Sequence, residues 1–493
     1  MRVLDLDLTA TRARAQTSIA TKLAEALWRE DIGDARRRFH GRVHAFDRVE
    51  LKPLEVDPLS LVEHEGLRAE LASAVTGLSL AYARRELQDE ERRNSGAVDM
   101  LALTSTNPPD VACMLLEQLA TEGHNLHPCG RTRLGWDLAD MLQHDLETPS
   151  TEVRFISVPP ETAFGDDIGT LTGVYPPRGR RVLPVHAWQL GHLRKKYPDR
   201  FTDGLLRIVD AAIPARPTAA LRTLLLPDGR YLKLSLDIQI TSTKRTISLA
   251  STRNGPRLSE LIARTIDSDR VLLMSETAGA ASPLGNGRQL SSIMRTGLAG
   301  RLEPGEFPVP GIALPSLDPI TGRTVLDGLV QRHGGGAVAF LDDYARLLLP
   351  VVLRLAARHG IGLEAHLQNC VPTFVNGRPH RIALRDFAGL RIFTQPGFEL
   401  WPGSVIGTDD REVMLAKVAY TAFQAHLGEI VLRLDIDASL AWQAIRAIVD
   451  EVLEGHPDHA FYTAPTVPHK ALTRMRLAGH GDVYTQVRNP LHG

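Results

Sequence analysis

The chain has 493 residues, 43% of them hydrophobic and 23% charged, a composition typical of a globular protein of two to four domains. Its formal net charge of −1 excludes recruitment of nucleic acid or an anionic membrane by a global electric field. The three cysteines form no CxxC pair, the N-terminal residues lack the apolar core of a signal peptide, and no window approaches the roughly 18 apolar residues that span a bilayer. We therefore expect a cytoplasmic protein that binds neither nucleic acid nor membranes.

The domain organisation follows from changes of pattern along the chain. Apolar residues recur every three or four positions in the first part, which predicts a helical domain over residues 1–150. Residues 151–323 contain short β-branched runs broken by proline and glycine, which predicts a β-rich domain ending in a loop-rich segment. Residues 324–493 begin with a long apolar helix that we expect to bend at Pro350 and end at Gly360, followed by a hairpin and further helices. This order predicts an α+β fold of three lobes.

A hairpin around the turn sequence PDG carries the first set of candidate residues. In its second strand the even-numbered positions are apolar and the odd-numbered ones polar, which predicts either a solvated sheet face or a face turned to a ligand. Lys233 and Arg245, with Arg222 nearby, would suit phosphate oxygens. A straight strand from Lys233 to Arg245 would span about 40 Å, at about 3.3 Å per residue. A shared phosphate site therefore requires the chain to bend or end its strand near Thr241.

A second group of polar residues flanks a predicted hairpin. The sequence GLEAHLQN precedes the turn pair Asn376-Gly377, and the returning strand leads into RDFAG. This hairpin would bring Asn369 close to Asp386, and their oxygens are ligands that Mg²⁺ on a triphosphate prefers. Alternatively, Asn369 caps a turn and Asp386 pairs with Arg385. We favour the functional interpretation, because burying so many polar groups without a role is costly.

Two further motifs are ambiguous. EGHNLHP has no third metal ligand beside its two histidines, so zinc is disfavoured, and imidazoles near Arg131 and Arg133 would suit an anion instead. Near the C-terminus, KALTRMRL places Lys470, Arg474 and Arg476 together. They would form either the solvated face of a helix or a clamp for a carboxylate. Only eight of the 57 basic residues are lysines, so each lysine is worth locating.

Together, and in this order, these segments resemble the NRPS-independent siderophore synthetases of the aerobactin-synthetase (IucA/IucC-like) family. The matching motifs lie between residues 122 and 477: EGHNLHPCGRTRLG, LPVHAWQ, LRT…KLSLDIQITSTKR, GLEAHLQN, RDFAG and KALTRMRL. The resemblance implies a cupped hand with a helical thumb, β-rich fingers and a kinase-like palm, and assembly as a homodimer. It also implies an enzyme that uses ATP and Mg²⁺ to adenylate a carboxyl group of citrate or a related polycarboxylic acid. The acyl group would pass to an amine, hydroxylamine or alcohol in siderophore biosynthesis.

The resemblance further implies roles for individual residues. ATP would be bound by His124, His127, Arg222, Lys233, Thr241, Arg245 and His366, among which Arg245, Lys233 and His366 would be catalytic. Glu364, Asn369 and Asp386 would hold magnesium, and Lys470 and Arg476 would bind the acid.

The chain departs from the family pattern at four positions: Asn125 and Ala187 replace prolines, Arg131 replaces a lysine and Ala220 replaces a serine. Because Ala220 lacks a hydroxyl expected near the phosphates, another donor must serve or ATP binds more weakly. Two alternatives stay open. The pair Asn369 and Asp386 alone would suit a small-molecule kinase that releases ADP, and Ala220 would suit a carboxylate-binding homologue without activity.

Overall fold

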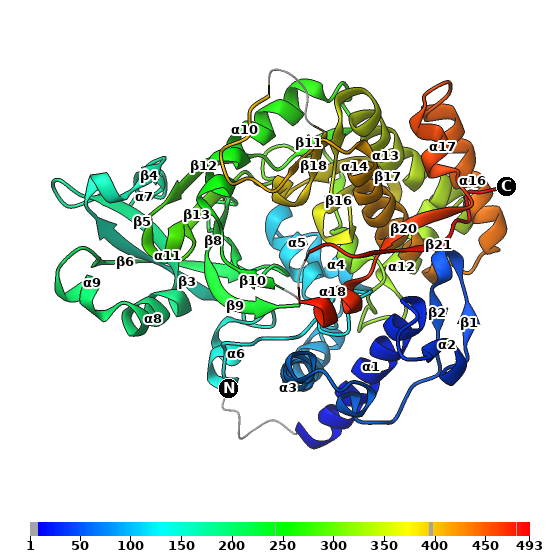
Figure 1. Ribbon diagram of the computed structural model, residues 1–493, viewed down its shortest axis with the longest axis horizontal. Helices are drawn as coiled ribbons and strands as arrows, with labels where there is room; N and C mark the ends of the chain where they lie inside the picture. The colour runs from blue at the N-terminus through cyan, green and yellow to red at the C-terminus, as the bar shows by residue number, and fades with distance from the viewer. Residues whose placement is uncertain (1–7, 242, 394–397, 480) are drawn as a thin grey trace.

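The computed structural model describes residues 8–241, 243–393, 398–479 and 481–493 (Figure 1). Its N-terminal part is helical. Helices α1 (Leu8–Arg29) and α3 (Glu65–Arg93) pack side by side through a buried apolar cluster that both helices share. The other elements here are α2 (Ala35–Arg38), the ribbon of β1 (Arg42–Val43) and β2 (Val49–Glu50), α4 (Met100–Thr104), α5 (Pro109–Glu117) and α6 (Leu138–His144).

An antiparallel eight-stranded sheet, of strand order β4-β12-β13-β8-β7-β6-β3-β5, extends to the left in Figure 1. Its strands are β3 (Thr151–Val158), β4 (Phe164–Gly165), β5 (Arg181–His186), β6 (Arg207–Pro217), β7 (Thr223–Leu225), β8 (Tyr231–Leu234), β12 (Glu276–Ala281) and β13 (Ser291–Arg295). The helices of this region are α7 (Ile168–Leu171), α8 (Ala187–Lys196), α9 (Pro198–Thr202), α10 (Leu249–Thr265) and α11 (Leu284–Gly287).

The predicted PDG hairpin is present, because β7 and β8 pair with Thr223 opposite Lys233. The second predicted strand, however, is interrupted at Ser235. The chain continues as β9 (Leu236–Ile240), which leaves the large sheet and pairs with β10 (Thr243–Arg245). Lys233 and Ser235 are only 3% and 2% exposed. The alternative of a solvated sheet face is therefore wrong at these two odd-numbered positions.

A four-stranded sheet, of order β11-β17-β16-β14, supports the second group of candidate residues. The predicted hairpin joins β16 (Cys370–Val375) to β17 (Arg378–Leu384), and Asn376 and Gly377 have the positive φ values, 51° and 78°, of a two-residue hairpin turn. The outer strands are β11 (Val271–Leu273) and β14 (Glu306–Pro308). Both precede residue 323, so the loop-rich segment does not separate the two sheets along the chain.

The C-terminal part surrounds helix α13 (Gly336–His359), whose apolar side chains lie in the largest core cluster. The helix continues through Pro350 and ends at Gly360, which has a left-handed φ of 62° as predicted for a C-terminal stop. The other helices are α12 (Val325–His333), α14 (Arg411–Val418), a π-helical segment (Ala419–Leu427), α15 (Gly428–Arg433), α16 (Ala438–Val452), α17 (Asp458–Tyr462) and α18 (Leu472–Ala478). The short strands are β15 (Ile361–Gly362), β18 (Arg391–Phe393), β19 (Gly407–Thr408), β20 (Thr466–Lys470) and β21 (Tyr484–Arg488).

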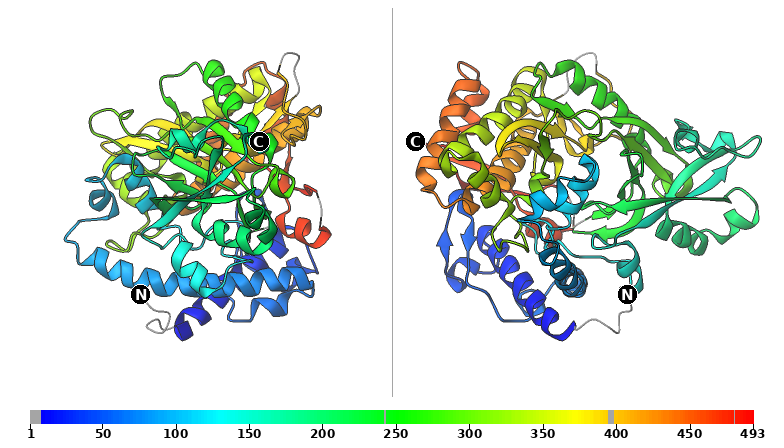
Figure 2. Two further views of the ribbon diagram at one scale, coloured as in Figure 1. Left: turned by 90° about the vertical axis from the view of Figure 1, so that its left-hand side faces the viewer. Right: turned by 180° about the vertical axis from the view of Figure 1, so that it is seen from behind.

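Figures 1 and 2 show three groups of elements: the N-terminal helices, the large sheet with its helices, and the C-terminal helices. Between them lie α5, α18 and the ribbon of β9 and β10. The predicted α+β class is confirmed. In the part of the chain that the structure describes, no helix is both long and apolar enough to cross a membrane.

Candidate active site

Lys233 is the centre of a buried ion cluster. Its Nζ lies 2.6 Å from Oδ1 of Asp386 and 3.6 Å from Oε1 of Glu276. Glu276 is the first residue of β12, and Asp386 follows β17 in a left-handed conformation with φ of 62°. Lys233 and Arg222 lower the pKa of Asp386 well below its usual range, whereas burial raises that of Glu276. The two sheets thus bring two carboxylates to one lysine.

Three arginines that bring no carboxylate partner of their own add positive charge to this cluster: Arg222, Arg245 and Arg295. Asp386 acts electrostatically on all three and opposes the lowering of their pKa values by burial. Among the residues that the structure describes, none of the three forms an ion pair with a carboxylate, and Nε of Arg245 and of Arg295 is buried without a hydrogen-bond partner. Buried cations without counter-ions are costly, so the arrangement suits an anionic ligand. We call these six residues the Asp386 cluster.

The predicted bend near Thr241 brings Arg245 into this cluster. Thr241 has a positive φ of 55°, and β10 runs back along β9 so that Arg245 pairs with Leu236. Nη2 of Arg245 donates to Oγ1 of Thr241 at 2.9 Å. Arg222 fixes the same turn, because its Nη1 donates to the carbonyl oxygen of Arg245 at 3.2 Å. Arg245 and Lys233 consequently both act on the charge of Asp386, although a straight strand would have kept them far apart.

The predicted histidines lie beside the cluster as neutral groups. The rings of His124 and His127 have their centroids 6.3 Å apart, and the Nδ1 atoms accept backbone N–H groups, of Leu126 and Cys129 respectively, each at 3.0 Å. Burial lowers the pKa of His127 to about 3, and burial together with the neighbouring histidines lowers that of His124 well below its usual value. Burial also lowers the pKa of His366. All three imidazoles are therefore uncharged at neutral pH.

The arginines after the histidine motif have a different role from the one expected. Nη1 of Arg131 lies 3.1 Å from Asp145, and Arg131 also pairs with Glu147. Nε of Arg133 lies 2.9 Å from the second oxygen of Asp145. These buried pairs neutralise both arginines, so the expectation that they attract an anion is wrong. They hold the loop of the histidine motif to the segment after α6 instead.

The three predicted magnesium ligands lie near one another but are engaged with other groups. Nζ of Lys417 lies 3.1 Å from Oε1 of Glu364, and Nδ2 of Asn369 donates to the carbonyl oxygen of Glu364 at 3.0 Å. Asp386 influences the pKa of Glu364, so the two carboxylates are neighbours. Arg385 pairs with Glu117, so the alternative pairing of Arg385 with Asp386 is wrong.

This donor set fits magnesium only in part. No group of three or more His, Cys, Asp or Glu side chains suited to a metal ion occurs among the described residues. Mg²⁺ is often held by one or two carboxylates together with substrate phosphates, however, and two carboxylates beside unpaired arginines match that arrangement. The residues present thus fit a magnesium ion that arrives with a phosphorylated substrate.

Each of the three C-terminal cations contacts a different partner. Nζ of Lys470 lies 2.9 Å from Oδ1 of Asp482, and the nearby Lys417 helps burial to lower the pKa of Lys470. Arg476 pairs with Glu70 and lowers the pKa of His127. Arg474 donates to the carbonyl oxygen of Glu30, which makes it a packing residue. The three cations therefore do not form one carboxylate clamp in this structure.

Sequence reasoning missed three residues of the site: Glu276, Arg295 and Lys417. Lys417 is one of only eight lysines, and that scarcity was the signal that could have found it. Glu276 and Arg295 lie outside every motif that we singled out, and no spacing marks them. Two departures from the family pattern also have structural settings. Nδ2 of Asn125 donates to Oε2 of Glu429 at 3.0 Å, and the backbone N–H of Ala220 donates to the hydroxyl of Thr218 at 3.3 Å.

Comparison with known proteins agrees with this picture. Residues 112–316 match the model of the IucA / IucC family, and residues 338–485 match that of the ferric iron reductase FhuF-like transporter. The chain is 24% identical to the D-ornithine–citrate ligase of Staphylococcus aureus, over 94% of this chain and 82% of that protein. It is 30% identical to the uncharacterized protein y4xN of Sinorhizobium fredii, over 63% of this chain but only 57% of that protein.

The solved structures extend the match to the fold. The structure superimposes on ATP-bound aerobactin synthetase IucA of Klebsiella pneumoniae with a TM-score of 0.72, at 17% identity and over 90% of both chains. The structure thus shares the mixed helix and strand fold of the aerobactin synthetases. In sequence, the chain is similar to the IucA / IucC family over residues 112–316 and to the D-ornithine–citrate ligase over most of its length.

Proposed function

We propose that this chain is an ATP-dependent ligase of siderophore biosynthesis. It adenylates a carboxyl group of citrate or a related polycarboxylic acid and joins that carboxyl to an amine, hydroxylamine or alcohol. The observation that carries the proposal is the charge of the Asp386 cluster, in which Arg222, Arg245 and Arg295 have no carboxylate partner among the described residues. Such a surplus of buried cations suits a triphosphate, whose charge would complete the cluster.

In the first step, the acid carboxylate attacks the α-phosphorus of ATP and pyrophosphate leaves. The arginines and Lys233 stabilise the charge that spreads over the phosphorus oxygens, which is the main catalytic contribution in phosphoryl-group chemistry. The guanidinium group of Arg245, held by its hydrogen bond to Thr241, is preorganised for this role. Neutral His124, His127 and His366 donate or accept hydrogen bonds without adding charge.

In the second step, the nucleophile attacks the acyl-adenylate and AMP leaves, with proximity supplying most of the rate. Asp386, Glu364 and Asn369 would hold magnesium, which would neutralise phosphate charge. Lys470 and Arg476 are proposed to bind the acid. Because Asp482 and Glu70 already pair with them, the acid would have to displace or share those carboxylates.

The three groups of elements would then act as thumb, fingers and palm around ATP, and the enzyme would work in the cytoplasm as a homodimer. A kinase is the second candidate, because the lysine held by a glutamate and an aspartate (Lys233, Glu276 and Asp386) matches the ion pairs that position ATP in kinases.

Product analysis tests the proposal. The purified protein is incubated with ATP, Mg²⁺, citrate and hydroxylamine, and the nucleotides and hydroxamates are measured by mass spectrometry. We expect AMP, pyrophosphate and citryl hydroxamate, all absent with Lys233→Ala as the matched control. ADP with a phosphorylated acid would establish the kinase instead. No nucleotide turnover with any polycarboxylate and amine would refute both enzymes.

A further inference from the structure

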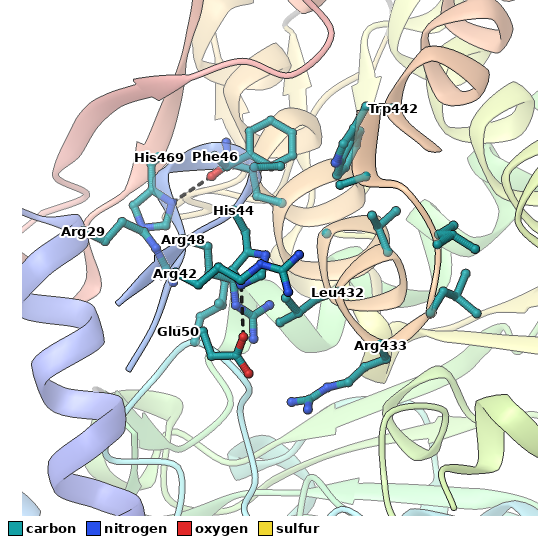
Figure 3. Close-up of a pocket in the computed structure, with 18 of the residues that line it drawn as sticks. Arg29, Arg42, His44, Phe46, Arg48, Glu50, Leu432, Arg433, Trp442 and His469 are labelled. Atoms are coloured by element: carbon teal, nitrogen blue, oxygen red, sulfur yellow. Dashed lines mark hydrogen bonds and ion pairs between the residues drawn. The ribbon is translucent and has the colours of Figure 1, made fainter. Parts of the chain in front are cut away.

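A second cationic cavity lies apart from the Asp386 cluster. It has a volume of about 320 Å³ and lies between the end of α1, the ribbon of β1 and β2, and helices α15 and α16 (Figure 3). None of the six residues of the Asp386 cluster lines it. Its basic side chains are Arg29, Arg42, Arg48 and Arg433, with His44 and His469 between them. A cavity of this size accommodates a small molecule.

Arg29 is a buried cation in the wall of this cavity, and its hydrogen-bonding capacity is not used. Its side chain lines the cavity although the residue is only 5% exposed, and its Nε is buried without a hydrogen-bond partner. Within the described chain, its guanidinium forms no ion pair or hydrogen bond. Burial and the neighbouring Arg48 lower its pKa to about 10.

Nearby acidic groups do not satisfy Arg29. Glu25 and Glu30 act on it electrostatically, yet each carboxylate is used elsewhere. Oε1 of Glu25 accepts the backbone N–H of Leu51 at 3.1 Å, and the oxygens of Glu30 accept those of Thr473 and Arg474. A buried guanidinium with these neighbours is costly unless an anion binds to it.

The other cations leave further charge uncompensated. Nη1 of Arg48 lies 2.6 Å from Glu429, and Nε of Arg433 lies 2.8 Å from the same carboxylate. One negative charge thus serves two arginines. Two other carboxylates line the cavity: Glu50, which lies 3.1 Å from Nε2 of His44, and Asp435. Four arginines thus face the three carboxylates of Glu429, Glu50 and Asp435. Arg42 forms no ion pair with any residue that the structure describes, so the cavity keeps a positive excess.

The remaining wall is apolar and reaches the active-site loop. Phe46 and Trp442 meet edge to face, with centroids 5.1 Å apart (Figure 3). Leu126, which lies between His124 and His127 in the chain, also lines the cavity. The wall therefore suits a ligand with a compact organic body, and an occupant would contact the back of the loop that carries the histidines.

We propose that this cavity is a second binding site, for a small multivalent oxyanion held by the guanidinium groups of Arg29, Arg48 and Arg42. Guanidinium forks bind carboxylate and phosphate oxygens bidentately, so citrate and pyrophosphate share the chemistry that the cavity recognises. None of the residues proposed to bind ATP, magnesium or the acid lines this cavity, so the proposal does not depend on the proposed reaction.

Calorimetric titration in an Arg245→Ala background, which weakens binding to the Asp386 cluster, tests the site. Citrate and pyrophosphate serve as separate probes, and monovalent acetate as the control ligand. We expect at least one multivalent probe to bind, and Arg29→Met to weaken that binding at least tenfold. Arg37→Met, the same change at an exposed arginine outside the cavity, should leave it unchanged. The probe that binds more tightly decides between a carboxylate and a phosphate ligand.

A second readout separates binding from folding. Because Arg29→Met removes a buried charge that lacks a partner, the ligand-free variant should melt at the same temperature as the parent or higher. Each multivalent probe that binds should raise the melting temperature of the parent more than that of the variant. Equal affinity of the Arg29→Met and Arg37→Met proteins, or no binding of either probe to the parent, would overturn the proposal.

Discussion

Glu276→Gln is the most informative substitution in the Asp386 cluster, because Lys233 has two carboxylate neighbours. Oε1 of Glu276 lies 3.6 Å from Nζ of Lys233, whereas Asp386 lies 2.6 Å away. At an effective dielectric constant of about 20, the attraction across 3.6 Å is about 5 kcal/mol before desolvation is subtracted. Glutamine keeps the size of the side chain but removes this attraction. Lys233 should then remain on Asp386 and compete with any magnesium ion there.

The effect on stability should be much smaller than this attraction. Glu276 is buried, its Oε2 has no hydrogen-bond partner, and burial raises its pKa. A carboxyl group whose pKa is raised by folding binds protons more readily in the folded state, so its ionisation costs stability as pH rises above its unfolded pKa of about 4.3. Removing the charge of Glu276 removes this cost, which offsets the lost attraction to Lys233. We therefore expect the melting temperature at pH 8 to change little.

The assay is the magnesium dependence of AMP formation. We expect the half-saturating magnesium concentration to rise about tenfold or more in Glu276→Gln, with a fall in turnover on the order of 10- to 100-fold. Unchanged magnesium dependence in a folded variant would refute the reasoning. A large loss of thermal stability would show that the ion pair outweighs the burial cost.

Four further predictions follow from the same contacts. Asp386→Asn should abolish AMP formation in a protein whose circular dichroism is unchanged; near-normal turnover would remove Asp386 from the metal site. Arg245→Ala should lower kcat/KM on the order of 10²-fold, and Arg37→Ala, at an exposed position, should not. Folding lowers the pKa of His127 to about 3, so this group should lower the free energy of unfolding by about 1.4 kcal/mol per pH unit as the pH falls below about 6.5. Thermal unfolding followed between pH 7 and 5 should depend less on pH in His127→Gln. Arg476→Ala should raise the KM for the acid more than that for ATP; an effect confined to ATP would contradict the acid assignment.

Local rules were sufficient where a turn or a strand break determined the geometry. The pair Asn376-Gly377 fixed the hairpin that places Asn369 near Asp386, because both turn residues need positive φ. The length of an extended strand likewise required the chain to turn near Thr241, and it does so. The domain boundary near residue 323 stays a prediction. Composition could not show that β11 and β14, which precede it, share a sheet with β16 and β17, because strand pairing joins segments that are distant in the chain.

Side-chain partners could not be predicted, because they come from elements distant in sequence. Arg131 and Arg133 resemble phosphate ligands in the sequence, but Asp145 and Glu147 neutralise them in the fold. Ser235 is one more polar residue on the predicted strand, but in the fold its hydroxyl accepts the backbone N–H of Ile247 at 3.0 Å. Removing this hydroxyl in Ser235→Ala would leave the buried N–H without its partner, at a cost of about 1–3 kcal/mol.

The ion pairs also decide which cations of the site remain free for a ligand. Lys470 and Arg476 already have carboxylates at bonding distance, whereas Arg222, Arg245 and Arg295 have none among the described residues. An anion gains most where it meets a charge without a partner, because no existing pair has to be broken. ATP phosphates should therefore bind to the arginines with little rearrangement. The acid, by contrast, should bind weakly until Asp482 or Glu70 moves away. Binding of the acid, rather than of ATP, should therefore require the conformational change.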